Sequence, residues 1–134
     1  MVTHEFLSAD GILCIRPVSP LTADDFSGLA AELDPWLDEH GPLKGLMIQA
    51  EAFPGWDNLA GMLSHFRFIR NHHRRVRRVA MVSDSSVLTI GPKIAAHFVA
   101  AEIRHFPADR REQAMAWLKD TNGDEKTGEG EPIT

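Results

Sequence analysis

The sequence predicts an α/β fold: a mixed, mostly parallel five-stranded sheet with one antiparallel edge strand and about four helices. Three observations support this prediction. A short hairpin and a helix open the chain, three strand–helix units follow in strict succession, and short uninterrupted apolar runs mark strands covered on both faces. Because right-handed crossovers join consecutive βα units, the sheet is expected to be largely parallel. The expected order is β-β-α-β-α-β-α-β-α.

The first two strands form a hairpin, which is expected over Thr3–Ser8 and Ile12–Pro17 with a turn at Ala9-Asp10-Gly11. The run Ile12-Leu13-Cys14-Ile15 is apolar without alternation, as in a strand that is buried on both faces. The second strand of the hairpin is therefore expected inside the sheet, and the first at its edge.

The first helix begins after Thr22, whose hydroxyl can cap it, and the acidic residues of its first turn favour its positive end. Apolar side chains at helical spacing form its buried face: Phe26, Leu29, Ala30, Leu33 and Leu37. Pro35 removes one helical hydrogen bond, so we expect a kink or a break near Asp34. Gly41-Pro42 ends the helix.

The next unit consists of a strand over Lys44–Ala50 and a helix that Asp57 can cap. The predicted core stripe of this helix is Leu59, Met62, Leu63, Phe66 and Ile69. At about 100° per residue, Phe68 falls roughly opposite Leu59, so its ring is expected on the solvent side.

The last two units complete the sheet. A strand over Val76–Ser83 precedes a helix with Pro92 in its first turn. Glu102–Phe106 alternates in polarity, which is typical of an edge strand. Asp109 begins the final helix, whose buried face consists of Ala114, Trp117 and Leu118.

One domain is expected over residues 1–119, followed by a disordered acidic tail over residues 120–134 that is poor in large apolar residues. The single cysteine, Cys14, excludes an internal disulfide. The N-terminus lacks the features of a signal peptide, and no apolar run approaches the roughly 20 residues of a membrane-spanning helix. A soluble cytoplasmic protein is therefore expected.

The net charge is −5, but the basic residues are unevenly distributed. No acidic residue occurs between Asn58 and Ser83. Six of the 14 basic residues lie within this stretch, namely Arg67, Arg70, Arg74, Arg75, Arg77 and Arg78. One edge of the molecule is therefore expected to be strongly positive on an acidic body.

Three stretches carry a family resemblance: Phe53-Pro54-Gly55-Trp56 with the helix after it, the strand Arg77–Asp84, and the C-terminal segments Ala101–Phe106 and Ala114–Leu118. In this order and spacing they resemble the SpoIIAA-like family, within the STAS/SEC14-type fold group. The resemblance spans roughly residues 3–119. It implies a mixed sheet with an antiparallel edge strand, a binding or regulatory domain more than an enzyme, and association with lipid or membranes.

One departure from the related anti-sigma-factor antagonists is informative. Those proteins carry an Asp-Ser-Ser-Gly phosphorylation motif at the start of the second helix, where this chain reads Gly55-Trp56-Asp57-Asn58 and has no hydroxyl. Asp84-Ser85-Ser86 has a similar composition but follows a later strand. A phosphorylation switch is therefore not expected.

The carboxyl ends of the parallel strands are the first candidate site, because an open α/β sheet usually binds its ligand there. Asp84 and Ser85 can hydrogen-bond a polar head group, while Phe53 and Trp56 can hold an apolar portion. The alternative is that Asp84 caps the following helix and that Trp56 seals this edge of the sheet.

The arginine-rich edge is the second candidate site, with an anionic membrane surface as its expected partner. Its residues are Arg67, Phe68, Arg70, Arg74 and Arg75. The alternatives are a solvated helix end for the arginines, and a dimer contact or a lone surface ring for Phe68.

The leading functional interpretation is a non-enzymatic binding module for a lipid or amphipathic small molecule, with peripheral association to the inner face of the membrane. The first alternative is a protein-interaction regulator that resembles anti-sigma-factor antagonists without the phosphorylatable serine, acting through a homodimer or a protein partner. The second is a small acid–base enzyme, such as a hydrolase, that uses Asp84 with a histidine.

Several kinds of site are not predicted. There is no catalytic signature and no cofactor motif, and the histidines lack the spacing of a metal site. Nucleic acid is not an expected partner, because the overall charge is negative and only His72 and His73 interleave with the arginines as stacking groups.

Overall fold

The computed structural model describes residues 2–50, 55–72, 75–84 and 101–120. Five strands form one sheet whose spatial order follows the chain, with β1 antiparallel to β2 and all later neighbours parallel. The strands are β1 (Val2–Leu7), β2 (Ile12–Pro17), β3 (Leu43–Gln49), β4 (Val76–Val82) and β5 (Glu102–Phe106). The predicted α/β class, the mixed sheet and its antiparallel edge strand are confirmed.

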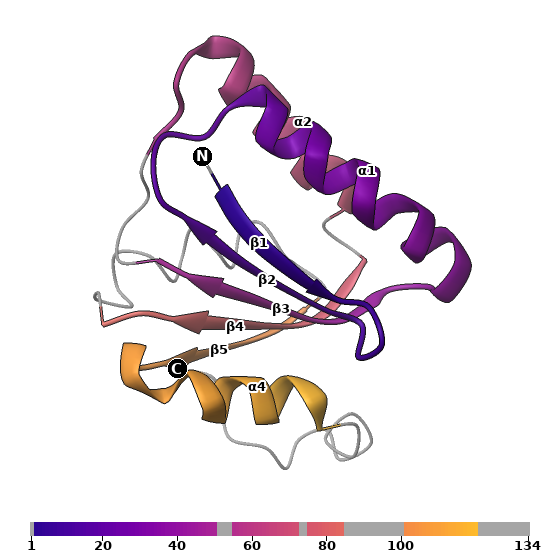
Figure 1. Ribbon diagram of the computed structural model, residues 1–134, viewed down its shortest axis with the longest axis vertical. Coiled ribbons are helices and arrows are strands. Elements are labelled where there is room, and N and C mark those ends of the chain that lie inside the picture. The colour runs from indigo at the N-terminus through magenta and orange to yellow at the C-terminus, as the bar shows by residue number, and fades with distance from the viewer. Residues whose placement is uncertain (1, 51–54, 73–74, 85–100, 121–134) are drawn as a thin grey trace.

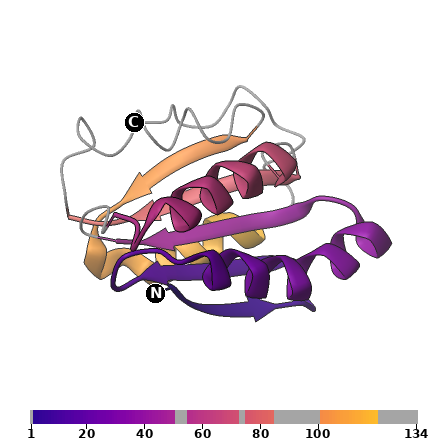
Figure 2. The same cartoon turned by 90° about the horizontal axis from the view of Figure 1, so that it is seen from above.

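Helices cover both faces of the sheet (Figure 1). α1 (Ala23–His40) and α2 (Leu59–His72) lie side by side over one face, as the view from above shows (Figure 2). The other face carries α4 (Arg111–Lys119), which follows a 3-10 turn at Ala108–Arg110. The described residues thus contain three α-helices where about four were expected. The expected helix that begins near Pro92 and the tail over residues 121–134 lie outside the described residues.

The predicted cap of α1 is confirmed, whereas the helix does not end at Pro35. The Thr22 hydroxyl accepts a hydrogen bond from the Asp25 amide, and the Asp25 carboxylate accepts one from the Thr22 amide, which completes a capping box. Of the kink or break expected near Asp34, the break is wrong, because the helix continues through Pro35 to His40, and the kink stays a prediction. Pro35 and Ala31 are both exposed, so water can bond the Ala31 carbonyl that loses its helical partner.

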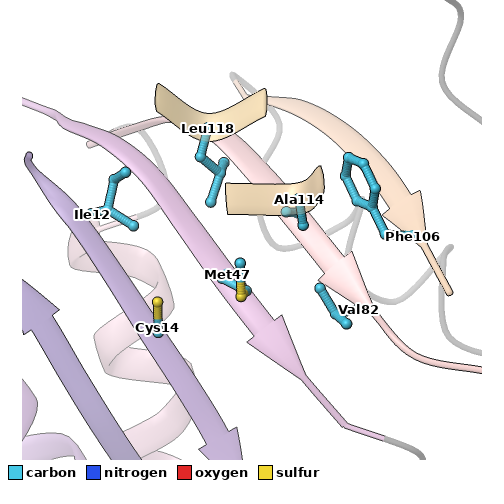
Figure 3. Close-up of a cluster of buried hydrophobic side chains, with 8 residues drawn as sticks. Ile12, Cys14, Met47, Val82, Phe106, Ala114 and Leu118 are labelled. Atoms are coloured by element: carbon cyan, nitrogen blue, oxygen red, sulfur yellow. The ribbon is translucent and has the colours of Figure 1, made fainter. Parts of the chain in front are cut away.

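The sheet separates two apolar layers. The layer under α4 is drawn in Figure 3 and consists of Ile12, Cys14, Met47, Ala80, Val82, Phe106, Ala114 and Leu118. The layer under α1 consists of Leu13, Leu29, Leu33, Leu37, Leu43, Leu46, Val76 and Val79. Gly45 lets α4 approach closely, because a Cβ there would lie 2.8 Å from Leu118 Cδ2. The edge strand β1 and the helices leave β2, β3 and β4 buried, as their apolar runs predicted.

Candidate functional site

The carboxyl edge of the sheet retains two described residues of the predicted ligand site, Trp56 and Asp84. Phe53 and Ser85 lie outside the described residues. Trp56 forms an isolated parallel bridge with Leu21, and its indole Nε1 donates a hydrogen bond to His65 Nδ1 at 3.0 Å. The ring therefore packs on the first half of α2, where its polar group is already satisfied.

Asp84 is exposed directly after β4. Its Oδ1 accepts a hydrogen bond from the Ala108 amide at 2.9 Å, which joins the end of β4 to the turn after β5. Trp56 and Asp84 thus contact different elements: Trp56 contacts α2, and Asp84 the turn after β5. The role of this edge as a ligand site stays a prediction.

His105 lies on β5, the strand next to the one that Asp84 follows, and its contact is structural. Its Nε2 donates to the Ser83 carbonyl at 2.7 Å, across the β4–β5 pair. Within the described ranges no group of three or more metal-ligating side chains is present. The acid–base enzyme remains an untested alternative.

The inward face of α2 differs from the predicted stripe. Its residues are Gly61, His65, Phe68 and His72, spaced at four, three and four residues. His65 stacks on Phe26 of α1 with ring centroids 4.9 Å apart, and Phe68 lies 5.7 Å from the same ring. A Cβ on Gly61 would lie 2.6 Å from the Leu21 carbonyl, so only glycine permits this approach. These contacts fix which side of α2 faces α1.

His72 closes the same interface at the end of α2. Its Nδ1 donates to the Phe68 carbonyl and its Nε2 contacts Asp34 Oδ1, each at 2.7 Å. The ring is buried and stacks on Phe68 with centroids 4.0 Å apart. A buried imidazole needs partners for both nitrogens, and here a backbone carbonyl and a carboxylate supply them.

The prediction that Phe68 faces solvent is wrong. Phe68 is half-buried and packs against the layer under α1. The prediction assumed that the more apolar side of α2 is buried. In the structure two histidines, His65 and His72, lie on the buried side instead, where they stack on other rings and form hydrogen bonds. The helix is therefore rotated, and three residues of the predicted stripe are exposed instead: Leu59 by 64%, Leu63 by 48% and Phe66 by 50%.

The outward face of α2 combines these apolar side chains with positive charge. Leu63, Phe66, Arg67 and Arg70 line an open groove of about 310 Å³. Phe66 is held edge-on by Trp56, with ring centroids 5.7 Å apart. No acidic residue occurs on α2. We call Leu59, Leu63, Phe66, Arg67 and Arg70 the α2 outer face.

The arginine cluster divides among several places, and Arg78 does not belong to the positive edge expected from the sequence. Arg67 and Arg70 lie on the α2 outer face, whereas Arg75 contacts Asp38 of α1 at 3.6 Å. Arg78 is buried on the opposite side of the sheet, where its Nη1 donates to the Trp117 carbonyl at 2.6 Å. Arg74 lies outside the described residues. The available signal was the strand predicted over Val76–Ser83, because side chains alternate between the two faces of a strand and this puts Arg77 and Arg78 on opposite sides of the sheet.

Among the described residues, Cys14 and Asp25 have shifted pKa values, and the roles of both are structural. Burial raises the pKa of the Cys14 thiol above its ordinary value; Arg111 opposes this shift and Glu5 adds to it. For Asp25, partial burial acts to raise the pKa, but hydrogen bonds from Thr22 and Val2 outweigh it and lower the pKa. Cys14 is therefore a core residue with an unreactive thiol, and Asp25 joins the start of β1 to α1.

Comparison with known families agrees with this fold. The model of the SpoIIAA-like family matches residues 12–119. A similar solved structure is that of an uncharacterized protein from the DUF3478 family with a SpoIIAA-like fold, from Shewanella loihica PV-4. It is 19% identical, with a TM-score of 0.63, and the match covers 88% of this chain and 92% of that one. Comparison with curated proteins gave no match. Because the family model spans most of its length, the chain belongs to the SpoIIAA-like family.

Proposed function

We propose that this protein is a non-enzymatic binding module that attaches reversibly to anionic membranes through the α2 outer face, where it takes up a lipid or another amphipathic molecule. The observation that carries the proposal is the composition of that face: three exposed apolar side chains beside Arg67 and Arg70, on a helix without an acidic residue. This combination matches the chemistry of an anionic lipid, which presents a negative head group above an apolar chain.

The expected strength of this contact is modest. Each arginine near an anionic surface contributes about 1 kcal/mol, and each half-exposed Leu or Phe about 1 kcal/mol on insertion. Together these contacts give about 5 kcal/mol, which corresponds to dissociation constants of about 0.1–1 mM in accessible lipid. Within the described residues, no helix combines the length and apolar character needed to cross a bilayer. The proposal therefore concerns peripheral, salt-sensitive binding.

Flotation with vesicles tests the proposal. The protein should float with phosphatidylcholine vesicles that contain phosphatidylglycerol and should stay behind with phosphatidylcholine alone. Binding should weaken at 1 M salt, where the Debye length falls to about 3 Å. Leu63→Ser should reduce binding at every salt concentration, since it removes apolar contact, whereas Arg67→Glu should reduce it most at low salt.

Arg110→Glu is the matched control for Arg67→Glu. It makes the same charge change at another exposed arginine, on the side of the sheet that α4 covers. This variant should float like the wild type. If the wild type does not distinguish anionic from neutral vesicles, or if both charge reversals weaken flotation equally, the membrane function is wrong. The α2 outer face would then be treated as a surface for a protein partner, as in the regulator alternative.

A further inference from the structure

A second groove lies at the end of the sheet where β3 and β4 begin, away from the loops that follow the strands. It has a volume of about 480 Å³ and is bordered by the β1–β2 turn, the end of α1 and the first residues of β3 and β4. These segments meet at one end of the molecule (Figure 1). The Gly11 carbonyl accepts hydrogen bonds from the Lys44 and Gly45 amides at 2.8 and 3.2 Å, which fixes the turn against β3.

Two cations lie next to each other in this groove. The register pairs Leu43 with Val76 and Gly45 with Arg78, so Lys44 is opposite Arg77 on the neighbouring strand. Strands in a sheet are about 4.8 Å apart, and like charges this close on one face disfavour each other. Both side chains line the same groove, on the α1 side of the sheet. The fold thus keeps two positive charges together.

No carboxylate of the described chain neutralises this pair. Neither Lys44 nor Arg77 forms a side-chain hydrogen bond or an ion pair with any described residue, and Asp10, the acidic residue in the lining, lies 3.8 Å from Lys119. The side chains of the two cations form no described hydrogen bond with the end of α1. There Leu37 O accepts from Gly41 N, and Trp36 O accepts from His40 Nδ1.

An aromatic wall faces the two cations. Trp36 and His40 stack with ring centroids 4.5 Å apart and an angle of 16° between planes, and Phe6 holds the Trp36 ring edge-on at 5.7 Å. Gly11 has a φ of +69°, and a Cβ there would lie 3.1 Å from Trp36 Cη2. The ring is therefore held close to the turn in a defined orientation before any ligand arrives.

We propose that this groove is a binding site for a small organic anion, in which Lys44 and Arg77 hold a phosphate or carboxylate and the Trp36–His40 stack contacts a planar ring. Paired cations match the charge of a phosphate or carboxylate, and Arg can bind either group through two parallel hydrogen bonds. The volume lies in the range of small-molecule sites. A nucleoside monophosphate has this chemistry, as does a flat aromatic carboxylate.

Amide and indole NMR shifts of the full chain test this proposal without any membrane. The probes are adenosine 5′-monophosphate, 1-naphthoate, adenosine and inorganic phosphate. At least one of the two ring-bearing anions should shift the Trp36 indole signal together with the Lys44 and Arg77 amides. Adenosine and inorganic phosphate should each bind at least tenfold more weakly than that anion. Binding by the nucleotide alone would assign the site to phosphates, and binding by naphthoate alone to carboxylates.

Arg77→Met is the test variant and Arg16→Met the control, since both residues are exposed arginines for which the described part of the chain shows no ion pair. Arg16 lies near the end of β2, whereas the groove borders the residues before that strand. Arg77→Met should weaken binding at least tenfold, and Arg16→Met should leave it unchanged. The proposal is overturned if neither anion shifts these signals at millimolar concentration, if inorganic phosphate binds as well as the better anion, or if the two variants behave alike. Because the groove shares no lining residue with the α2 outer face, a failure here leaves the membrane proposal standing.

Discussion

Single residues decide how the two helices on one face fit together. His65 and His72 occupy positions that composition alone assigns to the surface, yet they face α1. Trp56 donates to His65 Nδ1, and the Phe68 carbonyl and Asp34 contact the two ring nitrogens of His72. This arrangement leaves Leu63 and Phe66 outside. The available signal was the spacing of seven residues between the two histidines, which puts them on one side of the helix. It identifies a polar buried face only when partners on other elements are known.

Asp25 links β1 to the start of α1, and its replacement by Asn should lower the free energy of unfolding by about 1 kcal/mol at neutral pH. Because the folded-state pKa of Asp25 is lowered, its contribution is complete above the ordinary value of 3.8 and is lost as the pH falls through the folded value. Urea melts at neutral and acidic pH should therefore show the two proteins converging in acid. Asp24→Asn, an exposed change in the same helical turn, should shift stability by less than about 0.5 kcal/mol. A constant difference at every pH would contradict this role for Asp25.

Arg77 and Arg78 are neighbours in the sequence, but their replacement should change the free energy of unfolding by very different amounts. Arg78 is buried and donates to the Trp117 and Asp120 carbonyls, so Arg78→Met should cost about 2 kcal/mol by leaving the end of α4 without these bonds. Arg77→Met should cost less than about 0.5 kcal/mol, or stabilise slightly, because it relieves the repulsion with Lys44. Chemical denaturation measures both values, and similar losses in the two variants would show that the described division of the arginines is wrong.

At the scale of elements, the strands were predictable and the second helix was not. The bounds of β2 and β5 match the expected ones, β3 is shifted by one residue, and β4 ends one residue earlier. For β2, β3 and β4 the reason is that uninterrupted apolar runs are buried on both faces of a parallel sheet. For α2, several rotations bury a comparable apolar area, so periodicity could not choose among them. The cap of α2 also lies one residue later than expected: Asn58 Oδ1, and not the Asp57 carboxylate, accepts a hydrogen bond from the Gly61 amide.

The contact between α4 and the sheet gives a matched pair of glycine substitutions. Gly45→Ala should destabilise by about 1–3 kcal/mol, because its Cβ would lie 2.8 Å from Leu118 Cδ2 and would displace α4. Gly28→Ala lies in α1, where nothing is within 4 Å of the new Cβ, and should stabilise by about 0.5–1 kcal/mol through helix propensity. Thermal or urea unfolding of both variants is the measurement. A neutral Gly45→Ala would mean that α4 does not pack this closely.

For the whole molecule, the structure separates two surfaces that the sequence combined into one. The acid-free stretch indicated an anion-binding protein, but the alternation of β4 sends Arg77 to one groove and Arg78 to the far side of the sheet, while α2 keeps Arg67 and Arg70. The predicted ligand residues at the carboxyl edge, Trp56 and Asp84, could be placed on their loops from the sequence. Their hydrogen bonds to other elements could not, since these depend on how the elements pack.

The central claim is that the α2 outer face enters the membrane interface, and a fluorophore placed on that face tests it most directly. Leu63→Cys can be labelled with a polarity-sensitive dye in the native protein, because Cys14 is buried and burial raises the pKa of its thiol. Gln113→Cys, at an exposed position of α4 on the other side of the sheet, is the control.

On addition of vesicles that contain phosphatidylglycerol, the label at position 63 should gain intensity and shift to the blue as it leaves water, while the label at position 113 should not change. Phosphatidylcholine vesicles should leave both labels unchanged. An unchanged spectrum at position 63 with anionic vesicles, or an equal change at both positions, would contradict the account.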